Sequence, residues 1–134
     1  MFQRLTLAIT FLLLLISSNH VMAIAPVVSF TAPLNNSSYA APATITLTAN
    51  ASNAAGATIT NVQFFQGTVN SGLTLLGSSS TAPYSVNWSN VAAGNYYVTA
   101  RATNSLGEVT TSTSIAFVVN APAVAAPVVS LTTP

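Results

Sequence analysis

The sequence predicts an all-β protein built as a sandwich of two sheets, and three observations support this prediction. Apolar and polar residues alternate along several short segments, which is the period of a half-buried strand. Turn-forming residues separate these segments at regular spacing. After residue 23, no stretch of ten or more residues has an amphipathic helical pattern. With no helix to cover a sheet, two sheets must pack together to bury one face of each.

Seven segments have the composition of strands. In residues 43–50, for example, Ile45 and Leu47 fall on one face while threonines fall on the other. The seven segments are residues 27–31, 43–50, 61–66, 73–79, 84–88, 96–103 and 109–119. Turns rich in Asn, Ser, Ala and Gly are expected at residues 35–38, 53–56, 70–72, 92–95 and 104–107. Four prolines lie at the edges of the segments, as a residue without an N–H donor must: Pro26, Pro33, Pro42 and Pro83.

The first 23 residues have the layout of a secretory signal peptide. Arg4 supplies the positive charge, residues 5–16 form an apolar run, and a more polar stretch ends in Val21-Met22-Ala23. We expect cleavage after Ala23, which leaves a secreted or cell-surface protein without a membrane span. The alternative is an uncleaved anchor, but the apolar run is shorter than the roughly 20 residues that a membrane-spanning helix needs.

The charge count excludes most catalytic sites. The chain has two Arg, one Glu, one His and no Cys, and removal of residues 1–23 leaves only Arg101 and Glu108. A glycosidase needs two carboxylates, a zinc site needs a cluster of ligands, and a serine triad needs a His with an acid. We therefore expect no catalytic residue, metal or cofactor. Nucleic acid is not an expected partner, because there is no basic stripe for phosphates.

Short motifs occur in a fixed order along residues 25–120. They read PVVS at 26–29, ATITL at 43–47, NVQFF at 61–65, APY at 82–84, AGNY at 93–96 and ARATN at 100–104, with Gly107 after them. In this order they resemble the bacterial immunoglobulin-like (Ig-like) domains of secreted and cell-surface proteins. The resemblance implies a seven-stranded Ig-like sandwich. It also implies a module of the kind that occurs in repeats, beside carbohydrate-active enzymes or in adhesins, as a spacer or binding unit.

The chain departs from that family pattern at two loop positions. Where such domains often have Asp, this sequence has Asn53 and Asn104. Hard cations favour charged oxygen ligands, so we do not expect calcium to be held by these neutral amides. The Cys pair and third-strand Trp of antibody domains are also absent, since Trp88 falls on a later segment.

Three aromatic residues are expected in the structural core. Phe64 shares a face with Val62, and Trp88 alternates with Tyr84 along one segment. Trp88 is expected to be buried, with a partner for its indole N–H. Tyr96 follows a Gly-Asn turn, so its ring should pack at a sheet corner while its hydroxyl bonds to the backbone, as in a tyrosine corner.

The remaining aromatics, Tyr39, Phe65 and Tyr97, are the candidates for ligand contact. If exposed together, their rings could stack on sugar faces. The alternative is structural. Phe65 would then pack under the segment at 73–76, Tyr39 would cover a loop, and Tyr97 would be one of the single exposed apolar groups that surfaces normally carry.

A repeated motif predicts a second domain. Residues 25–33 read APVVSFTAP and residues 126–134 read APVVSLTTP, which are identical at seven of nine positions with an offset of 101 residues. That offset is about one Ig-like domain. We expect a signal peptide at 1–23, the sandwich at 24–120, and a linker with the start of a second repeat at 121–134, as in a fragment of a tandem-domain protein. The alternative is an incidental Pro-rich tail.

These observations favour a non-catalytic secreted module that spaces or positions other domains. The alternative is a carbohydrate-binding or adhesin module whose partner is a polysaccharide or a protein at the cell surface. A contiguous platform of exposed aromatics would favour this alternative. An enzyme would have to act with one carboxylate and no His.

Overall fold

The computed structural model describes residues 24–54 and 56–130, so the predicted signal peptide lies outside the described residues. The described residues form nine strands and no helix: β1 (Val27–Ala32), β2 (Ser37–Ala40), β3 (Ala43–Ser52), β4 (Ile59–Thr68), β5 (Gly72–Ser79), β6 (Tyr84–Val91), β7 (Gly94–Asn104), β8 (Val109–Thr111) and β9 (Ile115–Asn120). The all-β prediction is confirmed. Within these ranges, accordingly, there is no helix that could cross a membrane.

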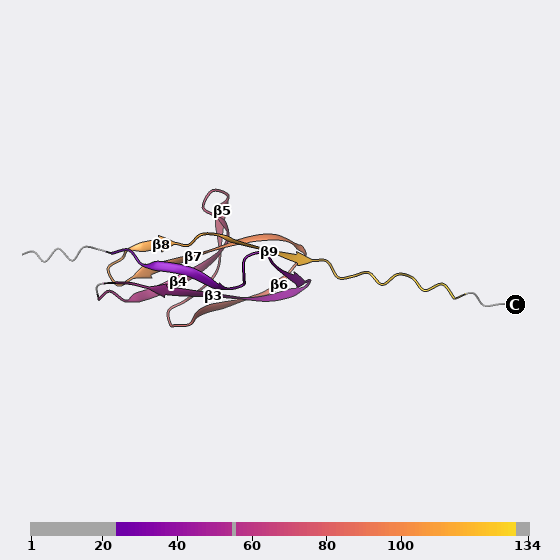
Figure 1. The fold of residues 1–134 in the computed structure, drawn as a ribbon, viewed down its shortest axis with the longest axis horizontal. Coiled ribbons are helices and arrows are strands. Elements are labelled where there is room, and N and C mark those ends of the chain that lie inside the picture. The colour runs from indigo at the N-terminus through magenta and orange to yellow at the C-terminus, as the bar shows by residue number, and fades with distance from the viewer. Residues whose placement is uncertain (1–23, 55, 131–134) are drawn as a thin grey trace, which may run out of the picture.

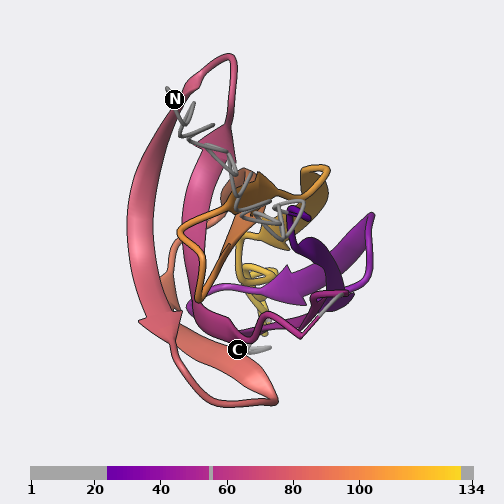
Figure 2. The ribbon, with the colours of Figure 1, turned by 90° about the vertical axis from the view of Figure 1, so that its left-hand side faces the viewer.

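The strands form two sheets that pack face to face. The smaller sheet has the order β1-β3-β6, and the larger has the order β2-β9-β7-β4-β5 with β8 paired to β7. Every strand pair is antiparallel except β2 with β9. Figure 2 looks along the long axis, and the strands on its two sides enclose a common interior. This is the predicted Ig-like sandwich.

All seven predicted segments form strands, but the last one is divided in two and β2 is a strand that was not predicted. After β1, the chain turns at residues 33–36 and continues as β2 in the other sheet, so Ser37 and Ser38 lie in a strand and not in the predicted turn. The last segment is interrupted at residues 112–114, because the three residues between Thr111 and Ile115 face only two between Val98 and Arg101. The extra residue breaks the ladder like a β-bulge.

The core lies between the sheets and follows the alternation of the sequence. In β3, Ala43, Ile45, Leu47 and Ala49 are buried while the residues between them are exposed or half-buried. The inward residues of the larger sheet complete the core: Val62, Phe64, Val98, Ala100, Ala102, Phe117 and Val119. The burial of apolar surface, which contributes about 25 cal/mol per Å², is the main stabilising term for such a core.

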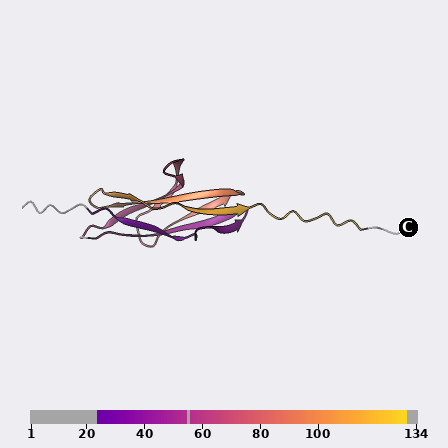
Figure 3. The ribbon, with the colours of Figure 1, turned by 45° about the horizontal axis from the view of Figure 1, so that its top comes forward.

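The sandwich has its two chain ends at opposite ends of its long axis. The chain enters β1 at one end and leaves β9 at the other (Figure 1), and the tilted view in Figure 3 shows the same arrangement. Residues 121–130 carry no secondary structure and are exposed. The last four residues of the repeated motif lie outside the described residues, so the start of a second repeat stays a prediction.

Candidate functional site

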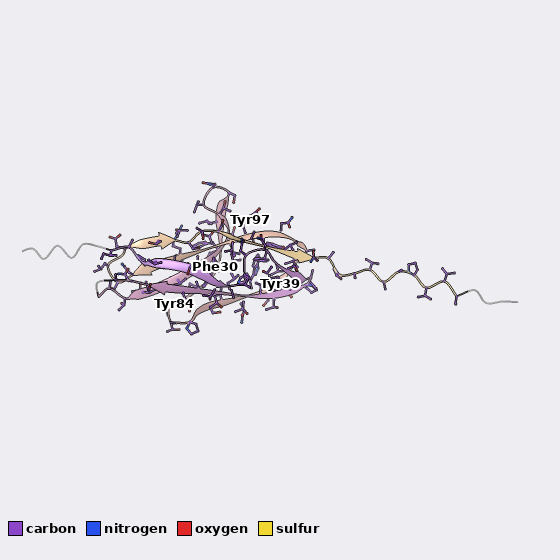
Figure 4. All side chains as sticks on the ribbon, viewed as in Figure 1. Phe30, Tyr39, Tyr84 and Tyr97 are labelled. Atoms are coloured by element: carbon purple, nitrogen blue, oxygen red, sulfur yellow. The ribbon has the colours of Figure 1, made fainter. Side chains whose placement is uncertain are left out.

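The three aromatics proposed as ligand contacts do not form a platform. Tyr39 lies on β2 with its ring half-buried, and it meets Phe117 edge-on with ring centroids 5.8 Å apart. Phe65 is buried, with 8% of its surface exposed, whereas Tyr97 is 52% exposed. Figure 4 shows Tyr97 close to the projecting hairpin at the top of the view and Tyr39 lower, toward the C-terminal end of the sandwich.

The expectation that Phe65 is available to a ligand is wrong. Phe64 points between the sheets, so the next residue points to the outer face of the larger sheet. There the guanidinium carbon of Arg101, on the adjacent strand β7, lies 5.0 Å from the centroid of the Phe65 ring. Phe65 also pairs with Leu75 of β5, within the segment under which it was alternatively expected to pack. Arg101 stacks on an aromatic ring, and among the described residues it forms no ion pair with Glu108.

Tyr97 lines a shallow pocket on the outer face of the larger sheet. The pocket has a volume of about 280 Å³, and its lining includes Asn36, Asn95, Tyr97, Ala116 and Val118. Tyr97 of β7 pairs with Ala116 of β9. The short Ala116 side chain leaves a hollow between the Tyr97 ring and Asn36, whose own N–H donates to the Ala116 carbonyl at 2.7 Å. An exposed aromatic therefore stands beside two exposed amides.

A second pocket, of about 390 Å³, lies next to the first on the same face. Hydroxyl and amide groups dominate its lining: Thr68, Val69, Asn70, Thr99, Ser112, Thr113 and Ser114. One wall is the β4–β5 hairpin, whose loop stands out from the body in Figure 1. Gly67 allows the bend, because its φ is +111° and an added Cβ would collide with the Gly72 carbonyl oxygen. The Thr99 hydroxyl donates to the Gly67 carbonyl at 2.8 Å and fixes the hairpin against β7.

No pattern in the sequence marks Asn36, Asn95 or Ala116 as a ligand contact. Asn95 could have been found by alternation, because it lies two residues before Tyr97 and so shares its face. Asn36 could not have been found from the sequence, because its position beside Tyr97 depends on the parallel pairing of β2 with β9. That pairing joins residues about 80 positions apart, and no local pattern indicates it.

Tyr96 forms the corner expected of it. Its hydroxyl donates to the Ala92 carbonyl at 2.9 Å, and its ring stacks on Phe117 with centroids 5.6 Å apart. Trp88 meets the Tyr96 ring edge-on at 5.1 Å. Trp88 is only half-buried, in contrast to the burial that was expected, because it lies on β6 at the margin of the sandwich. Phe64 is fully buried and contacts Phe30 edge-on at 5.9 Å.

The two loop asparagines meet each other. Nδ2 of Asn104 donates to Oδ1 of Asn53 at 3.0 Å, next to the entry of the chain into the sandwich. In the part of the chain that the structure describes, no three His, Cys, Asp or Glu residues lie close enough to hold a metal ion. The chemistry available on the surface is thus that of amides, hydroxyls and a single exposed tyrosine beside a pocket.

The described residues thus form an Ig-like sandwich with a tyrosine corner. The sequence matches the profile of the family described as Bacterial Ig domain over residues 26–100, and the chain belongs to that family. A comparison with curated proteins found no match.

Solved structures have the same fold. Clostridium thermocellum CbhA fibronectin(III)-like modules align with a TM-score of 0.63 and 25% identity, over 73% of this chain and 48% of that chain. The sixth fibronectin type III domain of a human fibronectin type III domain containing protein aligns with a TM-score of 0.52 and 15% identity, over 78% and 89% of the two chains. The present chain thus spans about half the length of the clostridial structure that it matches.

Proposed function

We propose that this chain is a non-catalytic secreted Ig-like module that spaces or positions neighbouring domains of a longer extracellular or cell-surface protein. The observation that carries this proposal is the position of the chain ends at opposite ends of the sandwich (Figure 1). A module of this shape, inserted between two others, separates them by its full length. A module whose ends lie together would instead branch off the side of the protein.

The repeated motif supports a neighbouring domain of the same kind. Residues 126–134 repeat the segment that contains β1, and residues 121–125 form an exposed stretch rich in Ala and Pro between β9 and this repeat. Pro122 fixes its own φ and biases Ala121 toward an extended conformation, which suits a short connection between modules. The chain also matches about half of a clostridial chain described as fibronectin(III)-like modules, in the plural, which supports a neighbouring domain of similar fold.

The test is the size and location of the native product. An antibody raised against residues 24–120 is used to blot cell, envelope and culture-medium fractions. We expect a band much larger than the 13.7 kDa of this sequence, in the envelope or the medium. A band near the size of the processed chain would contradict the tandem arrangement. Retention of all signal in the cytosolic fraction would contradict secretion, and N-terminal sequencing of the exported product should begin at Ile24.

A further inference from the structure

The outer face of the larger sheet carries two uncharged pockets along β7, which together are called the trough. Tyr97 and Ala116 line one pocket, while Thr99 and Ser114 line the other. Tyr97 and Thr99 differ by two residues along β7, so these two side chains project on one side of the sheet, while Ser114 lies in the interruption before β9. The two pockets, of about 280 and 390 Å³, therefore both border β7. The β4–β5 hairpin bounds the trough on one side and the turn before β2 bounds it on the other.

The chemistry of the lining is specific. It includes threonine and serine hydroxyls, the amides of Asn36, Asn70 and Asn95, one exposed aromatic ring and the apolar side chains of Val69, Ala116 and Val118. No ionisable carboxylate, guanidinium or ammonium group is among the lining residues. The closest cation on this face, Arg101, already stacks on Phe65. Such a surface matches a ligand that is neutral, rich in hydroxyls and flat enough to stack.

We propose that this trough binds a segment of a neutral polysaccharide. The Tyr97 ring, standing over the hollow at Ala116, stacks against the apolar face of one sugar ring. The amides of Asn36 and Asn95 exchange hydrogen bonds with the hydroxyls of that sugar. The second pocket takes the next sugar along the chain. There the hydroxyl of exposed Ser114 is available, whereas that of buried Thr99 already donates to the Gly67 carbonyl.

The lining disfavours other macromolecules. Protein interfaces have an apolar centre with several large anchoring side chains, and this trough has only one exposed aromatic. Nucleic acids and acidic glycans need Lys or Arg to neutralise their charge, and none faces the trough. The proposal goes beyond the spacer function, and it can fail while the spacer function holds, because it concerns binding and not the size or location of the product.

The test is isothermal titration calorimetry of the purified chain against three soluble neutral polysaccharides, hydroxyethylcellulose, galactomannan and arabinoxylan, with alginate as the acidic comparison. We expect saturable binding to at least one neutral polymer and none to alginate. Tyr97→Ala should weaken that binding at least tenfold. Ala116→Gln should weaken it similarly while keeping the tyrosine, because the longer side chain fills the hollow.

A matched control is Val27→Ala, which removes an exposed apolar side chain from the smaller sheet and should leave binding unchanged. Fluorescence of Trp88, the single tryptophan of the chain, verifies that each variant is folded. No binding to any of the three neutral polymers would overturn the proposal, as would binding that both trough variants leave intact. Equal binding to alginate would also overturn it. If Tyr97→Ala instead abolished self-association in sedimentation, the face would be a protein interface.

Discussion

The side-chain amide of Asn104, at the end of β7, donates from Nδ2 to Oδ1 of Asn53, which follows β3, across 3.0 Å. The second Nδ2 hydrogen reaches the carbonyl of Ile24 at 3.2 Å. Oδ1 of Asn104 accepts from the backbone N–H groups of Leu106 at 3.0 Å and Glu108 at 2.9 Å. Asn104 is 2% exposed, and all its bonding capacity is used. A carboxylate could accept both bonds but could not donate either, which explains an amide where similar domains often have Asp.

Replacing Asn104 by Ala should destabilise the fold by about 1–3 kcal/mol, because buried Asn104 is the acceptor for the backbone N–H groups of Leu106 and Glu108. The measurement is urea unfolding followed by Trp88 fluorescence. Asn95→Ala is the matched control, since Asn95 is exposed, and its effect should stay within about 0.5 kcal/mol. Equal stability of the two variants would show that the Asn104 network contributes nothing to folding.

Calcium should leave the stability of this domain unchanged. The amides of Asn53 and Asn104 bond to each other, and their neutral oxygens are poor replacements for the carboxylates that calcium favours. Thermal unfolding is measured in excess EDTA and in millimolar calcium, and the two melting temperatures should agree. A rise in melting temperature that saturates with calcium would reveal a site and contradict this reading of the two loops.

Tyr96→Phe should cost about 0.5–1.5 kcal/mol, the net value of one hydrogen bond, because only the bond from its hydroxyl to the Ala92 carbonyl is lost. The stacking of the ring on Phe117 is retained. Tyr97→Phe on the next residue makes the same chemical change at an exposed position and should be nearly neutral. Chemical denaturation of both variants measures their losses in unfolding free energy. A larger loss for Tyr97→Phe than for Tyr96→Phe would contradict the tyrosine corner.

Arg101→Met should destabilise the domain by about 0.5–2 kcal/mol, although the sequence places Arg101 on a polar face where replacement would be expected to matter little. Methionine keeps an apolar cover over Phe65 but removes the cation above its ring. Glu108→Gln, which removes the other charge of the sandwich, is the comparison and should cost less. If Arg101→Met and Glu108→Gln proved equally destabilising, the stacking of Arg101 on Phe65 would not contribute measurably to stability.

The alternation of side chains allowed much of the fold to be predicted. It placed Phe64 inward and Phe65 outward, and it put Ile45 and Leu47 on the buried face of their strand. The strand β2 and the division between β8 and β9 were missed, because each depends on pairing with a distant partner. Whether a side chain on the outer face is exposed was also not predictable. Phe65 and Tyr97 both point away from the core, yet only Tyr97 is open to solvent.

The all-β fold class, the inward face of several strands, the near absence of charge and the repeated segment at the end are all evident from the sequence alone. Each of these is a property of residue type or of short-range period, which local sterics and burial impose. The tertiary structure decided how the outer face is used. The bond from Thr99 to the Gly67 carbonyl, the stacking of Arg101 on Phe65 and the approach of Asn36 to Ala116 all join residues far apart in the chain. Exposure depends on such long-range contacts, and a local pattern cannot encode them.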